Sequence, residues 1–386
     1  MSNIITKSFR INLFIMKLCH LYPPEKRTTL FKIRAYLIQI LFVVPVPVLG
    51  IIYLLTEKNL DVEKANYNAG FLAQATCLIA KLFPFIRNGD RIKGCIMYFE
   101  TYCVPLKKQS QKNIINDCVN VCRRNTFIFL FCVTGGVTSW ATRPLFWDGR
   151  NLPVDLWLPF NPYENWFVYS CVYVYVTVGE LFSSLVTGIL DPLIAGLAYH
   201  ATGQIKILKD NLEHLLEFDN EKLTVNEMTK NVLIYNRIKR CVVHHNATLS
   251  FIKEFEECFS PVVFSQFAGS VFVICFCCLQ MSKVSSEGFY FMQLVMYFSV
   301  ILAQLYFYCY YGSTLFEESN NLTNAIYIGR WYDYDTKSKK ALITLMERSR
   351  EPITVTAGKI LDLSLATFAT ILRRSYSLLA VLKNYE

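Results

Sequence analysis

The most informative side chains for chemistry are two adjacent arginines, Arg373 and Arg374, inside an apolar segment near the end of the chain. An arginine at the middle of a bilayer costs roughly 2.5–3.5 kcal/mol on insertion scales, so it needs water or a partner. A helix that faces only lipid offers neither. We therefore expect one face of this segment to contact protein and another to line water, which is typical of a protein that forms a channel.

The helical period divides this segment into faces. At about 100° per residue, one face mixes apolar and polar groups as a pore wall does, and it consists of Leu372, Ser375, Tyr376, Leu379 and Lys383. Leu379 is the predicted gate, with Leu382 and Lys383 one turn above it, because a hydrophobic constriction can close a pore by dewetting. The alternative is that these leucines pack on neighbouring helices, and the helical pattern alone favours neither.

Arg373 and Arg374 point away from that face. Glu180 lies within an earlier apolar segment, and its depth differs from theirs by less than two helical turns at ~1.5 Å per residue. An ion pair between Glu180 and one of the arginines is one possibility, and water in a pocket or pore is the other.

No pattern typical of catalysis or of cofactor binding is present. The sequence has no metal motif, no nucleophile elbow and no phosphate-binding loop. His244 and His245 are adjacent and would point about 100° apart on a helix, so a shared metal site is not expected. We predict neither an enzyme nor a cofactor.

Composition places the chain in a membrane. Of its 386 residues, 53% are hydrophobic and only 18% are charged, against about 25% charged in a soluble chain. Apolar runs of about the ~20 residues that cross a bilayer predict an all-α membrane protein with seven transmembrane helices. These spans are residues 33–55, 69–86, 126–142, 166–198, 261–281, 289–312 and 360–382. The third is the shortest, and the fourth is long enough for its end to project into water.

Basic residues give the orientation. Eight lysines and arginines fall between Arg87 and Arg124, whereas the alternate loops hold one or two each. The positive-inside rule then predicts a cytoplasmic N-terminus and, with seven spans, an extracellular C-terminus. The net charge of +9 is explained by these loops, so we expect the lipid bilayer and no nucleic acid as a partner.

Two polar stretches are predicted to continue below the membrane as amphipathic helices, residues 200–260 and 314–350. Their apolar faces must bury against one another or against other subunits. We therefore divide one integrated membrane domain into residues 1–312, a six-helix ligand-binding bundle with cytoplasmic extensions, and residues 313–386, an anchor helix followed by a pore-lining last helix. The predicted anchor residues are Tyr327, Trp331, Leu342, Leu345 and Met346.

An ordered series of short motifs runs through the last part of the chain. It comprises Ala325-x-Tyr327, Trp331-Tyr332, Met346-x-Arg348-Ser349, Pro352, Thr356-Ala357-Gly358-Lys359, Leu363-Ser364-Leu365, Thr367-Phe368, Ile371-Leu372 and Ser375-Tyr376-Ser377. This series resembles the insect odorant receptor family, and so does the Pro- and aromatic-rich stretch from Asn151 to Tyr169. Asp362 and Ala366 depart from the family pattern, which usually has a proline and an acid there. The chain lacks the TY…QF ending of the gustatory receptors and the long insertion of the co-receptor, so it resembles a tuning subunit.

The resemblance implies an odorant-gated, non-selective cation channel in the plasma membrane of olfactory sensory neurons. It also implies a tetramer with the odorant receptor co-receptor, a pore lined by the last helix, and a cytoplasmic anchor. A small volatile ligand would enter a mostly apolar pocket in the outer half of the bundle. From spans two, three, four and six the candidate pocket residues are Phe71, Ala75, Gly136, Ser139, Trp140, Tyr169, Tyr173, Thr177, Leu294, Tyr297 and Phe298. Ordinary helix packing is the alternative for each.

Three other classes compete with this interpretation. A seven-helix receptor coupled to G proteins would need an external N-terminus and motifs such as DRY or NPxxY in place, and Asn161-Pro162-Tyr163 lies in a loop. A gustatory-receptor-like channel is a further alternative. A solute transporter lacks support, because no inverted repeat or paired broken helices are evident.

Overall fold

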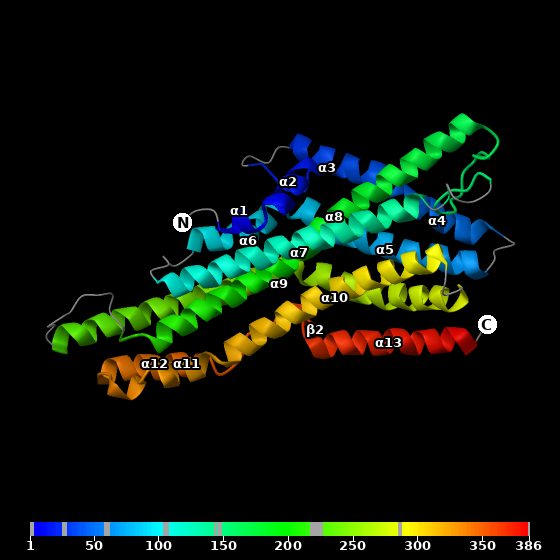
Figure 1. Ribbon diagram of the computed structural model, residues 1–386. Coiled ribbons are helices and arrows are strands. Elements are labelled where there is room, and N and C mark those ends of the chain that lie inside the picture. Colours follow the sequence, from blue (N-terminus) through cyan, green and yellow to red (C-terminus); the bar gives the residue numbers. More distant parts are fainter. Residues whose placement is uncertain are drawn as a thin grey trace.

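The computed structural model describes residues 4–24, 29–57, 62–102, 108–142, 144, 149–216, 227–284 and 288–384. Long helices dominate this part of the chain and lie roughly along one axis (Figure 1). The helices are α1 (Ile4–Ser8), α2 (Arg10–Leu18), α3 (Thr29–Phe42), α4 (Pro45–Thr56), α5 (Val62–Arg87), α6 (Gly89–Tyr102), α7 (Gln109–Thr142), α8 (Trp166–Glu213), α9 (Glu227–Lys283), α10 (Phe289–Asn320), α11 (Leu322–Ile328), α12 (Thr336–Arg348) and α13 (Leu365–Asn384), with a 3₁₀ turn, η2 (Trp331–Asp333), before α12.

Seven helical segments run the length of the apolar part of the bundle, as the sequence predicts. The first is divided between α3 and α4, because Pro45 and Pro47 follow Val44 and interrupt the backbone hydrogen bonds. The other six are α5, α7, α8, α9, α10 and α13. In Figure 1, α1 lies on the side of the bundle towards α11 and α12, whereas the end of α13 lies at the opposite end of the molecule.

Six of these segments are apolar and long enough to cross a bilayer, and α7 is the exception among the described helices. Its first half carries Lys112, Asp117, Arg123 and Arg124, so only its second half, the predicted span from Thr126 to Thr142, is apolar. The predicted overhang of span four is confirmed. At ~1.5 Å per residue, the 48 residues of α8 far exceed the ~30 Å hydrocarbon core.

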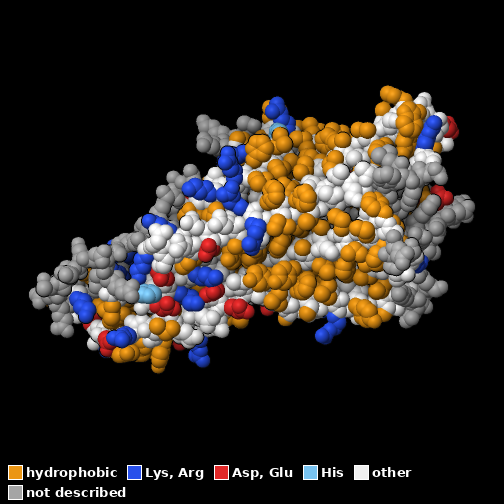
Figure 2. Space-filling view, viewed as in Figure 1, with side chains coloured by type: hydrophobic (Ala, Val, Ile, Leu, Met, Phe, Trp, Pro, Cys, Tyr) orange, Lys and Arg blue, Asp and Glu red, His pale blue; other side chains and the backbone are white. Residues whose placement is uncertain are grey.

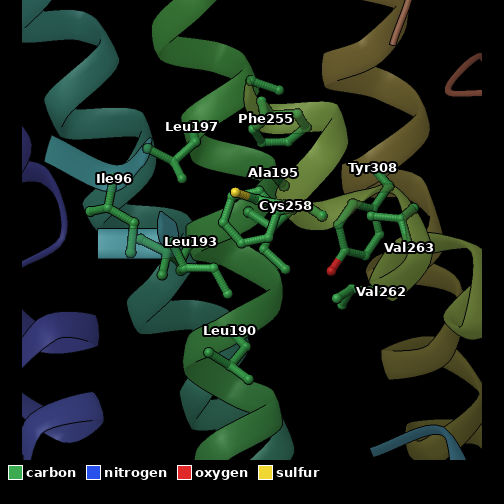
Figure 3. Close-up of a cluster of buried hydrophobic side chains, with 14 of the residues drawn as sticks. Ile96, Leu190, Leu193, Ala195, Leu197, Phe255, Cys258, Val262, Val263 and Tyr308 are labelled. Atoms are coloured by element: carbon green, nitrogen blue, oxygen red, sulfur yellow. The ribbon is translucent and has the colours of Figure 1, made fainter. Parts of the chain in front are cut away.

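The main core lies where α8, α9 and α10 pack together. Figure 3 shows Leu190, Leu193 and Leu197 of α8 among the side chains of α9, with Tyr308 of α10 beside Val263. These residues are at most 1% exposed. This core holds α8, α9 and α10 in a fixed relation.

A second, smaller core lies beyond the apolar belt, where the ends of α8 and α9 meet α11 and α12. Leu342 and Leu345 of α12 are buried in it, and Trp331 and Met346 pack against it. Burial raises the pKa of Tyr334 to about 12, so its hydroxyl stays protonated and donates to the carbonyl of Gly329 at 2.7 Å. The apolar face of the predicted anchor helix therefore packs within its own chain.

One small sheet was not predicted from the sequence. Strands β1 (Thr356–Ala357) and β2 (Leu361–Asp362) form an antiparallel hairpin before α13. Gly358 and Lys359 both have positive φ, which the type I′ turns of hairpins require. Glu256 of α9 accepts hydrogen bonds from the amide and hydroxyl of Thr356 at 2.7 and 2.8 Å. The hairpin thus fixes the start of α13 against α9.

The surface matches a membrane protein. Figure 2 shows apolar side chains over the part of the molecule where α3, α10 and α13 lie, whereas charged side chains gather at the end formed by α11 and α12. Exposed leucines and isoleucines of α3, such as Leu37 at 58% and Ile40 at 56%, face outward in this belt. Such a surface is stable in lipid and not in water.

Candidate functional site

A cavity of about 210 Å³ lies inside the apolar part of the bundle, enclosed mainly by α5, α7, α8, α9 and α10. Pockets for drug-sized ligands are roughly 300–1,000 Å³, so this cavity suits a smaller molecule. Its wall is mostly apolar and carries a few polar groups. Lining residues include Val43, Phe71, Ala75, Gly136, Trp140, Val273, Phe276, Leu294, Tyr297, Val300 and Ile301.

Aromatic rings form one side of the cavity. Phe71 of α5 and Trp140 of α7 stack with centroids 5.7 Å apart and planes 7° apart. Both pack against a small cluster around Val154, which belongs to the loop between α7 and α8. This loop is tied to the bundle by the amide of Trp157, which donates to the carbonyl of Leu49 at 3.2 Å. The loop therefore holds the two rings in place.

The polar groups of α8 that line the cavity recur at helical spacing. They are Glu180, Ser183, Ser184 and Thr187, which lie on one face because i, i+3, i+4 and i+7 coincide. Within the described residues, Glu180 has no hydrogen-bond or ion-pair partner. Among the described residues that line the cavity, it is also the single Asp, Glu, Lys or Arg.

Two amide oxygens on the wall are buried and unpaired within the described part of the chain, Oε1 of Gln74 and Oε1 of Gln280. The amide nitrogen of Gln280 is paired, since Nε2 donates to the hydroxyl of Tyr290 at 3.0 Å. Together with Glu180 these groups give the cavity three hydrogen-bond acceptors without donors.

Gln304 joins the cavity to a fully buried polar network around Asp191. Lys81 donates from Nζ to Oδ1 of Asp191 at 2.7 Å, and both side chains are at most 1% exposed. The hydroxyl of Tyr308 donates to the same oxygen at 2.6 Å, and Gln304 donates to Oδ2. The network links α5, α8 and α10, and Gln266 of α9 extends it by donating to Gln304 at 3.0 Å.

The structure brings six of the eleven predicted pocket residues together on the cavity wall. They are Phe71, Ala75, Gly136, Trp140, Leu294 and Tyr297. Ser139 lies just behind the wall, where its carbonyl and hydroxyl oxygens receive hydrogen bonds from Gln293 at 2.7 and 2.8 Å.

The other four predicted residues lie away from the cavity. The hydroxyl of Tyr169 donates to the carbonyl of Asn151 at 2.9 Å, and that of Tyr173 donates to the carbonyl of Ala141. Both tyrosines thus hold the ends of helices. Phe298 packs on the main core, and Thr177 is not among the lining residues.

Sequence reasoning left α9 out of the pocket and missed most polar lining residues. Val273, Phe276, Cys277 and Gln280 of α9 face the cavity. A signal was present in the glutamines at positions 74, 280, 293 and 304, because polar side chains inside membrane spans usually face the bundle interior. All four line the cavity.

The predicted pore helix α13 lies at the edge of the bundle (Figure 1) and packs on α9 and α10. Ser375 is 1% exposed and donates to the carbonyl of Ile371 at 2.9 Å, and Leu372 packs against the main core. Leu379 and Leu382 are half-buried, whereas Tyr376 is 72% exposed. The side chain of Lys383 lies outside the described residues. The predicted face is therefore divided between the chain's own bundle and the open surface.

The possible ion pair between Glu180 and an arginine does not form. Arg373 and Arg374 are both exposed, and Glu180 has no ion partner within the described residues. The reason is the position of α13, which packs on α9 and α10 instead of α8. Both α9 and α10 contact α8 as well as α13, and they separate the two helices.

Comparisons with known proteins now define the class. A sequence model of the family described as "7tm Odorant receptor" matches residues 61–376. The chain is 26% identical to odorant receptor Or1 of Anopheles gambiae over 98% of its own length and 95% of that protein's. It is 22% identical to odorant receptor 22c of Drosophila melanogaster over 81% of its own length and 79% of that protein's.

The fold is shared with a solved insect receptor. The structure of olfactory receptor OR5 from Machilis hrabei in complex with eugenol superposes with a TM-score of 0.83, covers 100% of both chains and is 15% identical. The chain belongs to the 7tm odorant receptor family, and it is a multi-pass membrane protein. This is a family of receptors and not of enzymes.

Proposed function

We propose that this chain is the ligand-binding subunit of an odorant-gated, non-selective cation channel. The observation that carries the proposal is the mostly apolar cavity within a seven-helix receptor bundle of this family. Its size and its aromatic wall suit a small volatile compound. Phe71, Gly136, Trp140, Leu294 and Tyr297 contact the ligand, and the rings of Phe71 and Trp140 stack on each other.

The pore is lined by α13 from each subunit of a tetramer with the odorant receptor co-receptor. Two features of α13 support this proposal. Arg373 and Arg374 are exposed on a helix in the apolar belt, where they need water or another subunit. Leu379 and Leu382 lie half-buried at the edge between the bundle and the open face, where a neighbouring subunit completes the constriction.

Subunits associate through the anchor below the membrane. Because Leu342 and Leu345 are buried within their own chain, the contact is made by other residues. Large apolar side chains exposed outside the apolar belt are the candidates: Tyr327 at 65%, Ile328 at 68%, Tyr332 at 59% and Ile343 at 51%.

The N-terminus is cytoplasmic and the C-terminus extracellular, in the plasma membrane of olfactory sensory neurons.

The test is current recording from cells that express this chain with and without the co-receptor, exposed to a broad panel of odorants. Surface labelling confirms delivery. The proposal requires inward current that depends on odorant, on the co-receptor and on this chain. A receptor complex that reaches the surface and passes no current with any odorant contradicts it.

The gate has its own variant. Leu379→Ser wets the constriction and raises current without odorant, partially so because the co-receptor subunits supply the rest of the pore. Arg374→Ala is the control and changes folding or coupling without a leak. Normal odorant responses with no added basal current in Leu379→Ser would show that Leu379 is a packing residue.

A further inference from the structure

Three polar side chains on the cavity wall have hydrogen-bond acceptors that no described residue pairs. The carboxylate of Glu180 and the buried Oε1 atoms of Gln74 and Gln280 receive no hydrogen bond from any described residue. The described residues that line the cavity include no lysine, arginine or histidine. Gln280 is only 5% exposed, so its unpaired oxygen depends on whatever occupies the cavity.

Unpaired acceptors in such a place are unfavourable. A buried polar atom without a hydrogen bond loses the water that solvated it and gains nothing in return, and a carboxylate loses more than an amide. The network around Asp191 illustrates the alternative, because there every carboxylate oxygen has a donor. A ligand that brings donors would satisfy the cavity in the same way.

We propose that the cavity selects ligands that present hydrogen-bond donors, with a small primary amine as the best match and an alcohol as a weaker one. This inference rests on the proposed function, in which the cavity is the odorant site. An ammonium group has three donor hydrogens and a positive charge, so it pairs with the carboxylate of Glu180 more strongly than a neutral donor does. The stacked rings of Phe71 and Trp140 and the aliphatic side chains accept the apolar body of the ligand.

The same geometry excludes other small volatiles. Esters, ethers, ketones and aldehydes carry acceptors only, so they leave the amide oxygens of Gln74 and Gln280 unpaired. A carboxylic acid would place a second negative charge beside Glu180. Shape alone would not give this ranking, because an amine, an alcohol and a methyl ether can share one skeleton.

The experiment compares such matched ligands on the wild-type receptor with its co-receptor. The probes are phenethylamine, phenethyl alcohol and phenethyl methyl ether, together with hexylamine, hexanol and hexyl methyl ether. In at least one series, the amine should activate at about tenfold lower concentration than the ether or better, with the alcohol between them, since a hydrogen bond to a charged group changes affinity by roughly that factor. Ethers that match the amines and alcohols in potency overturn the inference.

Glu180→Gln identifies the residue. It keeps the size of the side chain and removes the charge, so the advantage of the amine over the ether should fall by about tenfold while the ether response stays within about twofold. Glu317→Gln is the control, because Glu317 is exposed on α10 outside the cavity. An unchanged ranking in Glu180→Gln overturns the role of Glu180.

Failure of the inference is separable from failure of the proposed function. Odorant-evoked currents from donor-free ligands alone leave the channel in place and remove the donor rule. Silence towards every odorant, with the complex at the surface, removes both. If Glu180→Gln does not reach the surface, Gln280→Met tests the same rule, because it removes one acceptor and leaves the carboxylate.

Discussion

The cavity and the network beside it contain similar polar side chains and differ in how these are paired. Asp191 has three donors around its two oxygens and is 0% exposed, and its counter-ion Lys81 is 1% exposed. Glu180, less than four helical turns away on the same helix at ~3.6 residues per turn, has none within the described residues. The first carboxylate therefore has a structural role, and the second is available to a ligand.

This difference shows what a polar residue inside a membrane span indicates. A default functional interpretation of any intramembrane charge would have placed Asp191 and Glu180 in one class. Counting the donors around each carboxylate separates the two residues. Breaking a satisfied buried pair costs free energy, whereas removing an unpaired acceptor breaks no hydrogen bond. The predictions below change residues of the Asp191 network and residues of the cavity.

Breaking the buried ion pair should have the largest effect. Lys81→Met leaves Asp191 charged and buried without its counter-ion, a change that costs about 3–5 kcal/mol. Because total stabilities are roughly 5–15 kcal/mol, surface expression should fall severely. Surface labelling and thermal unfolding of the purified complex measure this.

Lys206→Met is the matched control for that change. Lys206 is 36% exposed and lies 3.5 Å from Glu318, and such exposed pairs contribute about 0–1 kcal/mol. Equal expression of Lys81→Met and Lys206→Met would mean that the buried pair is dispensable.

Removing one hydrogen bond from the network should cost less. Tyr308→Phe deletes the donor to Asp191 and keeps the ring, so we expect a loss of about 1.5–3 kcal/mol, the usual range for a bond to a charged group. The melting temperature of the purified complex should fall accordingly. Tyr306→Phe is the control, since Tyr306 is 43% exposed on the same helix, and indistinguishable melting curves would contradict the network.

Filling the cavity should alter ligand response and leave stability intact. Gly135 and Gly136 are adjacent on α7, and a Cβ at either meets no atom within 4 Å, but only Gly136 lines the cavity. Gly136→Leu should reduce odorant potency by about tenfold or more, because a few buried methylenes are worth 1–3 kcal/mol each in pocket discrimination. Dose–response curves for Gly135→Leu should match the wild type. Equal shifts in the two variants would place the ligand elsewhere.

The sequence predicted the spans and the overhang of α8 because apolar runs and helical periods are local properties. It also predicted six cavity residues, five of which have small or aromatic side chains within the expected spans. It did not predict the burial of Ser375 or the separation of Glu180 from Arg373. Both depend on which neighbours α13 packs against, and a period of 100° fixes the relative phase of residues but not the absolute rotation of a helix. Likewise, the amphipathic pattern at Leu342 and Leu345 predicts a buried face, but it does not show whether that face packs on the same chain or on another subunit.

The smallest expected effect comes from the same chemical change made in both regions. Glu180→Gln and Asp191→Asn each convert a carboxylate into an amide of nearly equal size. Asp191→Asn removes the counter-ion of Lys81 and gives Tyr308 and Gln304 a weaker acceptor, so the complex should unfold at a clearly lower temperature. Glu180→Gln breaks no hydrogen bond or ion pair within the described residues, so it should not lower the melting temperature. Melting curves of the two purified complexes, recorded without odorant, measure the contrast directly. If Glu180→Gln destabilises the receptor as much as Asp191→Asn does, Glu180 is held by a structural partner, and the carboxylate is not free for a ligand.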